Sequence, residues 1–519
     1  MSRLVRDSLK KAVKGTAFVF LSMVVSILIW FVDRIIIVRS TTIEEMGLYS
    51  MAVAVASVVA LLAALGLHEG STRYISFFIG EGREEDARRV ARTTLRIGFL
   101  SGLTASFLMY LTAGPAAMNV FYMPELVGPL RAMAPFPLFF VLVTLLVGIV
   151  RGFGDVWPRV LFVNIGQPLF FLFFLMAFMV LGLPFISIIF FYVATVALST
   201  VFSLRHARSR WGVRLFSFGS GGFRREMLAF SLPLLAGALI SILFSRTDTL
   251  MVGRYMNAEA VGVYNVAASM ASLLGFAVNS MGFVLLPIAG DLYARNHLNE
   301  LKRSFQVLTK WVFAVTFPMF FIVFFFPEMC VTFIFGLRYE SAAGPLSVLS
   351  IGYLVYVFVG ASNTLLTVMG LTRHMMAISF LVMVLNIVLN YLFIKVLGYG
   401  ILGTAWATTA SFLVYGILNT LLLYTRSGIQ PFTFNYTKPL LAASAIGLLI
   451  YAVAKILPLS FWMLPLYLAL FIIGYSASIL ATRSIEREDL DMLEAIGRRT
   501  GVDTVRVRKF LERFHVQAG

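Results

Sequence analysis

DRIIIVRSTTIEEMGLYSMA at residues 33–52 returns in altered form as DTLMVGRYMNAEAVGVYNVA at residues 248–267. At a constant offset along the chain, six positions keep their residue type: Asp33/Asp248, Arg39/Arg254, Glu44/Glu259, Gly47/Gly262, Tyr49/Tyr264 and Ala52/Ala267. Each copy leaves one apolar run, passes a short polar stretch and enters the next apolar run. We call this stretch the corner motif. A charged motif that occurs twice and aligns without a gap indicates an internal duplication.

The composition around the corner motif is that of a membrane protein. The 519 residues are 60% hydrophobic and only 13% charged, whereas soluble domains are about 25% charged. Fourteen apolar runs are long enough to cross a bilayer as helices. They are 15–38, 47–68, 93–114, 129–150, 158–181, 183–204, 228–252, 260–289, 306–327, 344–369, 375–397, 400–423, 438–457 and 461–482. The sequence therefore predicts an all-α integral membrane protein with about 14 transmembrane helices.

The distribution of basic residues predicts the orientation. With the N-terminus inside, the inner segments hold 32 of the 42 Lys and Arg. The outer loops hold five, namely Arg39, Arg254, Arg338, Lys395 and Lys455. Because cytoplasmic loops retain positive charge, we expect a multi-pass protein of the cell membrane with both termini cytoplasmic. The net charge of +17 then faces anionic membrane lipid, and no nucleic-acid partner is expected.

The spacing of the two copies predicts the domain organisation. Six predicted helices separate the copies, so both halves enter the membrane from the same side, as in a parallel repeat about the membrane normal. The sequence predicts an N-terminal six-helix lobe at 1–204, a cytoplasmic linker at 205–225 and a C-terminal six-helix lobe at 226–424. Two additional helices follow within 425–482. The basic tail at 483–519 is expected to lie as an amphipathic helix on the inner membrane surface.

Asp33, Arg34, Arg246 and Asp248 lie inside otherwise apolar predicted helices. A charge at the centre of a membrane helix costs about 2.5–3.5 kcal/mol on insertion scales, and less toward the helix end. Such a cost is sustained where the groups face a hydrated cavity or each other. Two interpretations follow: the charges line a functional cavity, or they form interfacial ion pairs that extend outward.

The remaining corner residues have structural interpretations. Gly47 and Gly262 are expected in tight outer turns, and Tyr49 and Tyr264 in the aromatic belt at the membrane surface. Arg39 is expected to pair with Glu44 across the exposed loop.

Two asparagines on one predicted helix suggest a cation site. Asn386 and Asn390 are four residues apart and therefore lie on one helix face. With Asp248 and a hydroxyl from Thr404 or Thr408, they offer several oxygen ligands to a small hard cation such as Na⁺. The alternative is that the asparagines hydrogen-bond between helices and that the threonines bond to their own helix.

Several stretches together resemble a known superfamily. They are the pattern D-x5-R-x4-E-x2-G-x-Y at both corners, FGLRYESAAGPLSVLS at 335–350, and N-x3-N followed by GYGILGTAWATTAS at 398–411. In order and spacing they resemble the multidrug/oligosaccharidyl-lipid/polysaccharide (MOP) flippase superfamily, and most of all its polysaccharide transporter branch. The resemblance implies two lobes in a V around a central cavity, lined by the first, second, seventh and eighth helices. It also implies a cation site in the C-terminal lobe.

The resemblance further implies a function. A polysaccharide transporter flips a polyprenyl phosphate- or pyrophosphate-linked oligosaccharide to the outer leaflet by alternating access, coupled to a Na⁺ or H⁺ gradient. We expect Arg34, Arg246 and Arg73 to bind the phosphate, Asp33 to contribute to substrate binding, and the last two helices to border a groove for the lipid tail. A monomer is the expected transport unit.

Two other functional classes compete with this one. A multidrug exporter of the same superfamily exchanges amphipathic cations for ions and favours acids and aromatic rings in its cavity, whereas arginines inside the spans favour a pyrophosphate. A membrane glycosyltransferase needs an outer catalytic loop, but the longest outer loops, 115–128 and 328–345, carry no paired carboxylates in a suitable arrangement. The chain has no P-loop, and its five histidines lack metal-ligand spacing. We therefore expect neither an enzyme nor a bound cofactor.

Overall fold

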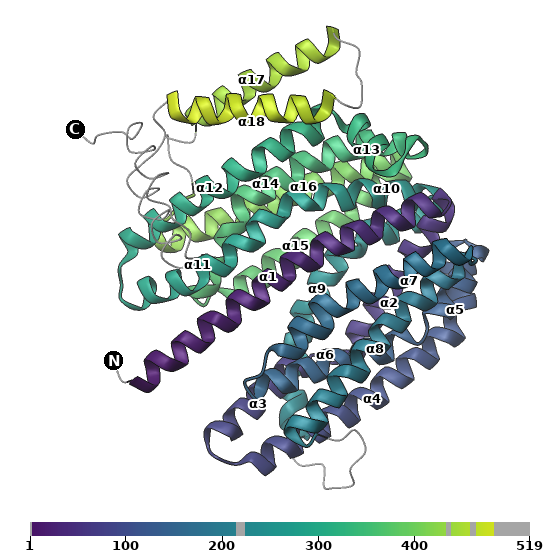
Figure 1. The fold of residues 1–519 in the computed structure, drawn as a ribbon, viewed down its shortest axis with the longest axis vertical. Coiled ribbons are helices and arrows are strands. Elements are labelled where there is room, and N and C mark those ends of the chain that lie inside the picture. The colour runs from purple at the N-terminus through teal and green to yellow at the C-terminus, as the bar shows by residue number, and fades with distance from the viewer. Residues whose placement is uncertain (1–2, 214–223, 432–436, 457–462, 482–519) are drawn as a thin grey trace. The chain divides into compact units, whose positions relative to one another are not determined.

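The computed structural model describes residues 3–213, 224–431, 437–456 and 463–481. Within these ranges nearly every residue lies in a helix and none lies in a strand (Figure 1), which confirms the predicted all-α membrane fold. Residues 214–223 of the predicted linker and the whole predicted tail at 483–519 lie outside the described residues.

The first half of the chain consists of long helices and a few short irregular ones. In order they are α1 (Arg3–Ser40), α2 (Ile43–Ala64), α3 (Leu67–Gly80), α4 (Glu84–Pro115), η1 (Ala116–Phe121), η2 (Pro124–Leu126), α5 (Val127–Met133), α6 (Phe136–Gly152), η3 (Arg159–Gly166), α7 (Gln167–Leu181) and α8 (Ile186–Trp211).

The second half continues in the same manner. Its elements are α9 (Arg224–Tyr255), α10 (Ala258–Ser272), η4 (Leu273–Gly275), α11 (Phe276–Ala294), α12 (Leu298–Phe325), α13 (Pro327–Phe335), η5 (Leu337–Ala342), α14 (Ala343–Val368), α15 (Thr372–Tyr391), η6 (Leu392–Val396), α16 (Gly400–Ser427), α17 (Thr437–Ile456) and α18 (Met463–Ala481). Within the described residues, the predicted apolar runs overlap these helices: the run at 260–289 covers α10, η4 and α11, and each of the others lies mainly on one helix or on two consecutive ones.

Length and composition identify the helices that can cross a membrane. Among the described residues, eleven helical segments are long and apolar enough to span a bilayer. Shorter apolar helices occur at Leu285–Ala294, which overlaps the end of the predicted span 260–289, and at Ser444–Val453 and Leu466–Ser478, which lie within the last two predicted spans. The multi-pass architecture is thus confirmed, while the count of fourteen stays a prediction.

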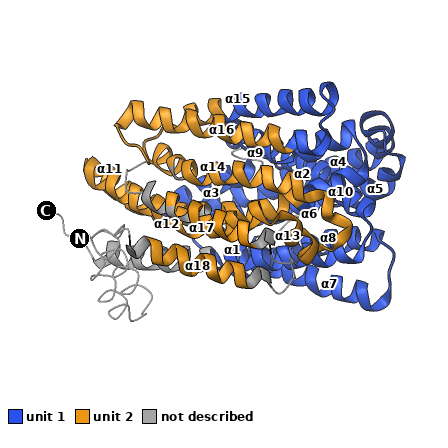
Figure 2. Cartoon of the chain, turned by 90° about the horizontal axis from the view of Figure 1, so that it is seen from above, with its two compact units in different colours: residues 1–266, 379–404 blue, residues 267–378, 405–519 orange. Residues whose placement is uncertain are grey.

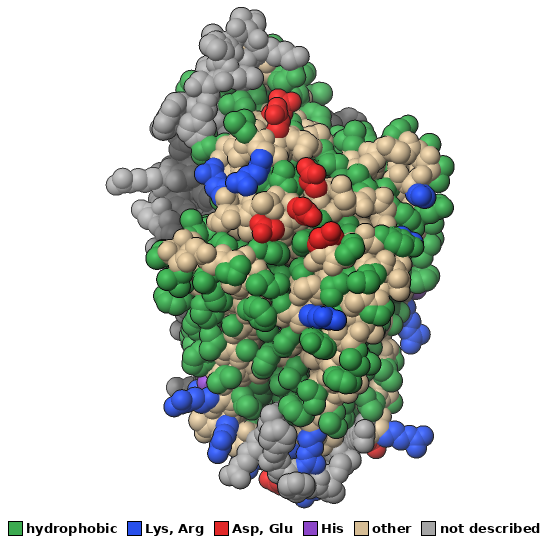
Figure 3. All heavy atoms as spheres, turned by 90° about the vertical axis from the view of Figure 1, so that its right-hand side faces the viewer, with side chains coloured by type: hydrophobic (Ala, Val, Ile, Leu, Met, Phe, Trp, Pro, Cys, Tyr) green, Lys and Arg blue, Asp and Glu red, His purple; other side chains and the backbone are tan. Residues whose placement is uncertain are grey.

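Large apolar side chains are exposed along these helices, as expected of a protein surrounded by lipid. Phe107 of α4 is 61% exposed and Val180 of α7 is 84% exposed. On the face drawn in Figure 3, apolar side chains greatly outnumber charged ones. In water such a surface drives association or aggregation, so its natural solvent is hydrocarbon.

Contacts divide the chain into two compact units (Figure 2). Unit 1 contains residues 1–266 and 379–404, and unit 2 contains 267–378 and 405–519. In unit 1, α9 packs against α2 and α3. A Cβ atom added to Gly70 of α3 would lie 2.2 Å from the Ser231 Oγ of α9, which shows how closely these helices approach. The predicted lobe boundaries between 204 and 226 stay a prediction.

Helix α2 begins and ends at identifiable residues. Thr42 caps its N-terminus: the Glu45 amide donates to the Thr42 hydroxyl at 3.1 Å, and the Glu45 carboxylate accepts from the Thr42 amide at 2.9 Å. This reciprocal pair is a capping box. Leu65 and Gly66 then adopt positive φ angles of 51° and 65°, which end α2 and start α3 in a new direction. The part of the corner motif from Ile43 onward therefore lies on a helix whose N-terminus is fixed by this cap.

In unit 2, the two additional C-terminal helices dock through aromatic rings. The Phe321 ring of α12 stacks on Phe471 of α18 with centroids 4.2 Å apart and planes 7° from parallel. A Cβ atom on Gly447 of α17 would lie 2.3 Å from the Phe321 ring. Stacked rings contribute about 0.5–1.5 kcal/mol beyond their area, so α17 and α18 pack tightly against α12.

Candidate functional site

The two copies of the corner motif meet each other inside unit 1. Gly47 lies in the second turn of α2 and Gly262 in the second turn of α10, so the prediction that they occupy tight turns is wrong. A Cβ atom on Gly47 would lie 1.7 Å from the Ala258 carbonyl oxygen, and one on Gly262 would lie 2.2 Å from that of Ile43. Both positions require glycine because the helix backbones are in contact.

This crossing is symmetric. Ile43 and Gly47 of the first copy correspond to Ala258 and Gly262 of the second at the constant offset between the copies. Gly47 touches Ala258, and Gly262 touches Ile43. A two-fold axis produces this arrangement: a position of the first copy contacts a different position of the second copy, and the two equivalent positions make the same contact in reverse. The local symmetry supports a parallel duplication; superposition of the complete lobes stays a prediction.

The corner tyrosines are buried rather than located in an aromatic belt. Tyr49 is 6% and Tyr264 is 1% exposed, so the belt prediction is wrong for both. The Tyr49 ring packs edge-on against Tyr192 of α8 with centroids 6.0 Å apart. The Tyr264 hydroxyl donates a short hydrogen bond to Asp248 Oδ2. Each tyrosine therefore belongs to one of two polar clusters within unit 1.

The first cluster surrounds Asp248 of α9. Asn390 Nδ2 of α15 donates to Asp248 Oδ1 at 3.0 Å and to the Asn386 carbonyl at 3.0 Å. Asn386 and Asn390 are 1% and 0% exposed. The structure thus brings together three of the four predicted cation-coupling residues, and Tyr264 joins them. Asn390 Oδ1 is buried without a hydrogen-bond donor among the described residues.

The donor set of this cluster fits a small hard cation. Asp248 contributes two carboxylate oxygens, Asn386 an amide oxygen 3.3 Å from Asn390 Nδ2, and Tyr264 a phenol. The unsatisfied Asn390 Oδ1 is a further acceptor that a cation would satisfy. Thr404, the fourth predicted ligand, is fully buried, and its Oγ1 lies 3.5 Å from the Gly400 carbonyl of its own helix. A contact with its own helix is the alternative to cation binding that the sequence left open for Thr404. The cation role itself stays a prediction.

The second cluster lies around Asp33. Asp33 is fully buried, and neither carboxylate oxygen has a hydrogen-bond partner among the described residues. An outward-extending ion pair is therefore the wrong interpretation for Asp33. Arg34, Arg246 and Asp33 each act electrostatically on the Tyr49 phenol. The two arginines also act on Tyr192.

Aromatic rings enclose this second cluster. Tyr192 packs against Trp30, Tyr49, Phe136 and Phe171, with ring centroids 5.5–6.0 Å apart. Arg246 Nε is buried without a hydrogen-bond partner in the described chain. The Asp33 carboxylate oxygens and Arg246 Nε thus keep unused hydrogen-bonding capacity within unit 1. Such capacity inside a membrane protein indicates a ligand or a proton.

Arg73 does not join Arg34 and Arg246. It is exposed on α3, with its guanidinium carbon 4.2 Å above the Phe230 ring of α9. Phe230 and Arg246 are separated by about 24 Å along the axis of α9, at the rise of an α-helix. Arg73 therefore lies far along α9 from Arg246, and the three predicted phosphate ligands do not form one site.

The sequence interpretation missed Tyr264 and Tyr192 as site residues. Tyr264 was visible in the corner motif, but its contact with Asp248 depends on how α10 packs against α9. Tyr192 lies in an apolar run, and nothing in its spacing distinguishes it from a lipid-facing tyrosine.

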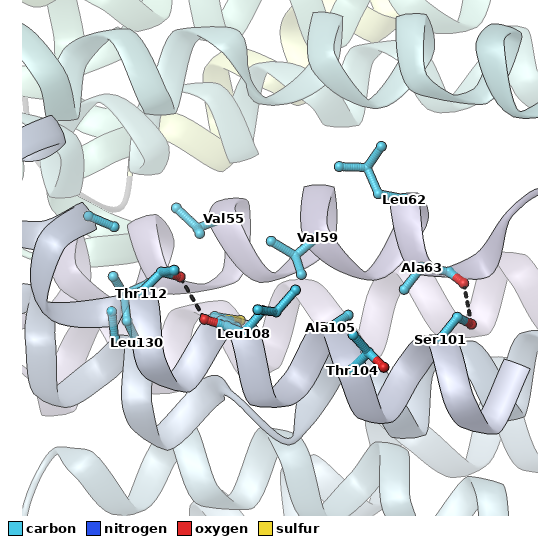
Figure 4. A pocket seen from close by; sticks show the side chains of 13 residues that line it. Val55, Val59, Leu62, Ala63, Ser101, Thr104, Ala105, Leu108, Thr112 and Leu130 are labelled. Atoms are coloured by element: carbon cyan, nitrogen blue, oxygen red, sulfur yellow. Dashed lines mark hydrogen bonds between the residues drawn. The ribbon is translucent and has the colours of Figure 1, made fainter.

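Apolar grooves occur in both units and are unsuited to a phosphate. One in unit 1, between α2 and α4, has a volume of about 500 Å³ (Figure 4). Its walls carry Val59, Leu62, Leu108 and Leu130, with Ser101 Oγ donating to the Ala63 carbonyl at 2.7 Å. Another of about 480 Å³ in unit 2 lies between α14 and α16. Neither lining contains a charged residue, so these grooves match hydrocarbon chains.

Comparison with known families gives two matches. Residues 12–292 match the family described as "Polysaccharide biosynthesis protein", and residues 233–392 match the MatE family. Both support the resemblance to the MOP superfamily that the corner motif indicated.

Three individual proteins illustrate the relationship. The chain is 24% identical over 251 residues to "Teichuronic acid biosynthesis protein TuaB" of Bacillus subtilis, covering 48% of this chain and 50% of the relative. It is 24% identical over 217 residues to "Probable low-salt glycan biosynthesis flippase Agl15" of Haloferax volcanii, covering 41% and 44%. The chain thus spans about half the length of the curated relatives it matches. Its fold resembles "Lipid II flippase MurJ, inward closed conformation" with a TM-score of 0.70 and 16% identity, covering 90% and 98%.

Proposed function

Because the chain belongs to the polysaccharide biosynthesis protein family, we propose that it flips a polyprenyl phosphate- or pyrophosphate-linked oligosaccharide from the cytoplasmic to the outer leaflet of the cell membrane. The observation that carries this proposal is the pair Arg34 and Arg246, which share the aromatic-lined cluster around Tyr49. The names of the relatives, which include a glycan flippase and a Lipid II flippase, support the same substrate class.

The chemistry of the substrate explains why arginine suits this position. A lipid-linked sugar carries an anionic phosphate at the membrane surface, a polar glycan and a tail that stays in the bilayer. Arginine remains ionised in an apolar setting and binds phosphate through two parallel N–H donors. Asp33, the fourth predicted substrate-binding residue, is fully buried, and both of its carboxylate oxygens lack a hydrogen-bond partner among the described residues. The aromatic rings exclude water and strengthen each contact with the phosphate.

Movement of the substrate requires the two lobes to alternate. We place the lobes at 1–204 and 226–424, with the symmetric Gly47 and Gly262 crossing between their outer corners. An ion gradient drives this cycle if the ion binds one conformation better than the other. The Asp248 cluster, with Asn386, Asn390 and Thr404, is the proposed site for Na⁺ or H⁺.

Reconstituted flipping tests the phosphate role. The purified chain is placed in liposomes with a fluorescent polyprenyl pyrophosphate-linked sugar, and the fraction protected from a membrane-impermeant quencher is followed. Arg34→Ala and Arg246→Ala should reduce the flipping rate, and the corresponding Lys substitutions should reduce it less because they retain the charge. Arg131→Ala is the matched control, since Arg131 is exposed on α5 and lies 5.6 Å from the Tyr110 ring. Full flipping by the double alanine variant would remove these arginines from the proposal.

The MatE match over residues 233–392 favours a second candidate, a multidrug exporter that exchanges cationic compounds for ions. Export of a cationic dye from the same liposomes separates the two functions. Dye export without flipping of the lipid-linked sugar would establish the second candidate and exclude the first.

A further inference from the structure

The groove between α14 and α16 in unit 2 has one apolar and one polar end. Its apolar part is lined by Val359 of α14 and Leu413 of α16, among other aliphatic and aromatic side chains. Toward the C-terminal end of α16 the lining acquires polar residues, including Tyr424 and Gln430. By the predicted topology this polar end faces the cytoplasm.

The groove is about as long as one leaflet is deep. Leu413 and Tyr424 both line it and are separated by about 17 Å along the axis of α16, at the rise of an α-helix. The hydrocarbon core of a bilayer is about 30 Å thick, so one leaflet contributes about 15 Å. Tyr424 is exposed, and tyrosines at the membrane surface lie at the level of the lipid headgroups. The groove therefore suits a hydrocarbon chain that belongs to a single leaflet.

One hydroxyl in the groove has unused hydrogen-bonding capacity. Thr420 lines the groove, and its Oγ1 is buried without a hydrogen-bond partner among the described residues. Thr409 and Ser411 of the same helix, in contrast, donate to backbone carbonyl groups at 2.8 and 2.7 Å. A buried hydroxyl that makes no hydrogen bond is costly, so an acceptor on a bound molecule would satisfy Thr420. This hydroxyl lies about 6 Å along α16 from Tyr424, one helical turn below the expected headgroup level.

Basic residues of α12 border the polar end of the groove. Gln306 Nε2 of α12 donates to the carbonyl oxygen of Gln430 at 3.2 Å, and Gln430 lines the groove. Lys302, Arg303 and Lys310 are three or four residues away from Gln306 in the sequence. Residues at these spacings are neighbours on a helix surface. These three residues, which we call the α12 basic cluster, therefore surround the position at which α12 meets the groove.

The helices around this end carry a positive charge. Together α12, α14 and α16 contain the α12 basic cluster and Arg426, against a single acid, Glu300. The Glu300 carboxylate lies 3.4 Å from His297 Nδ1. Basic pockets between membrane helices on the cytoplasmic side bind anionic lipid headgroups. The polar end of the groove is thus complementary to an anion, and its apolar part to hydrocarbon.

We propose that this groove binds an anionic phospholipid of the cytoplasmic leaflet. One acyl chain lies between α14 and α16, the Thr420 hydroxyl donates to an ester carbonyl oxygen, and the α12 basic cluster binds the phosphate of the headgroup. A polyprenyl tail is much longer than one leaflet is deep, so the short groove favours a phospholipid over the carrier of a sugar. The inference is independent of the proposed function, because it uses none of the residues assigned there to the phosphate or the ion.

Lipid binding to the purified full-length chain, measured by native mass spectrometry, tests the headgroup contact. The delipidated protein in detergent is titrated with dioleoyl phosphatidylglycerol, which is anionic, and with dioleoyl phosphatidylcholine, which has no net charge. Lys302→Gln should weaken phosphatidylglycerol binding about fivefold, the factor for one basic residue near an anionic surface. Neutralising all three residues of the α12 basic cluster should weaken it about a hundredfold, while phosphatidylcholine binding changes little. Arg208→Gln is the matched control, because Arg208 is exposed in the last turn of α8 in unit 1.

Two further variants test the acyl chain and the ester contact. Ile417→Trp fills the groove from an exposed position of its lining and should weaken binding of both lipids about fivefold or more. Val180→Trp, at an exposed position of α7, is its control and should bind as the unchanged protein does. Thr420→Val should weaken binding of both lipids about two- to tenfold. In lipid-free detergent it should not lower the unfolding temperature, because the hydroxyl that it removes makes no hydrogen bond there.

Each part of the proposal has a result that overturns it. Equal affinity of the unchanged protein for the two lipids, or a neutralised basic cluster that binds phosphatidylglycerol as Arg208→Gln does, refutes the headgroup site. If Ile417→Trp binds both lipids as Val180→Trp does, no acyl chain occupies the groove. A lower unfolding temperature of lipid-free Thr420→Val would show that this hydroxyl bonds within the protein. If polyprenyl pyrophosphate displaces phosphatidylglycerol at equal concentration, the groove holds the sugar carrier and the assignment to a phospholipid is wrong.

Discussion

Replacing Gly47 by alanine tests the symmetric crossing of α2 and α10. The new Cβ atom would lie 1.7 Å from the Ala258 carbonyl oxygen, whereas ordinary contact begins at 3.4 Å. The α10 backbone must therefore retreat by about 1.7 Å, and overpacking of this kind costs about 1–3 kcal/mol. Alanine gains about 0.5–1 kcal/mol over glycine within a helix. We expect a net loss of up to about 2.5 kcal/mol in the free energy of unfolding, from the difference of these two effects.

SDS-induced unfolding of the purified protein in mixed micelles, followed by tryptophan fluorescence, measures this loss. Gly114→Ala is the matched control, because Gly114 is helical and a Cβ atom there would meet nothing within 4 Å. It should be neutral or slightly stabilising. Gly262→Ala should destabilise for the same reason as Gly47→Ala, with a new contact of 2.2 Å to the Ile43 carbonyl.

The double variant tests whether the two contacts belong to one crossing. A single separation of the helices relieves both clashes, so Gly47→Ala combined with Gly262→Ala should cost less than the sum of the two. Contacting residues typically depart from additivity by about 0.5–3 kcal/mol. Strict additivity, or a Gly47→Ala variant as stable as Gly114→Ala, would refute the symmetric crossing.

Three further outcomes are expected. Asp248→Asn should leave the fold intact but reduce the stimulation of flipping by a Na⁺ or H⁺ gradient in liposomes; an unchanged ion response would remove Asp248 as the coupling residue. Burial raises the pKa of the Cys330 thiol to about 12, and the residue is 2% exposed. Maleimide should therefore label it at neutral pH only after denaturation, and rapid labelling of the folded protein would contradict the structure. Phe321→Ala should lower the free energy of unfolding by at least about 1 kcal/mol through loss of its stacking on Phe471, whereas Val180→Ala, at a lipid-exposed position, should change it little.

The sequence alone determined the class of the protein and much of its architecture. Long apolar runs have one common explanation, because a backbone in hydrocarbon must satisfy its own hydrogen bonds as a helix. The duplication was visible because the corner motif keeps charged and aromatic residues at a fixed offset. The Asn386 and Asn390 pair was predictable as well, since a spacing of four places both amides on one face of a helix. The position of Asp248 inside an otherwise apolar run showed that a charge lies within a predicted span.

Only the tertiary structure decided what the corner glycines and tyrosines do. Glycine is typical both of turns and of close helix contacts, and the choice for Gly47 depends on α10, a helix that lies far along the chain in the second copy of the motif. The same is true of Tyr264. Its sequence position is typical of a membrane-surface tyrosine, and only the packing of α10 shows that its hydroxyl contacts Asp248. Contacts so distant in sequence leave no local pattern.

The separation of Arg73 from Arg246 along α9 also required the tertiary structure. In a soluble protein the polar face of a helix shows which side meets water. In a membrane, lipid tails and the protein interior are equally apolar, so hydrophobic periodicity does not show which face meets another helix. The sequence therefore determined that charges enter the spans, and packing alone decided which of them share a site.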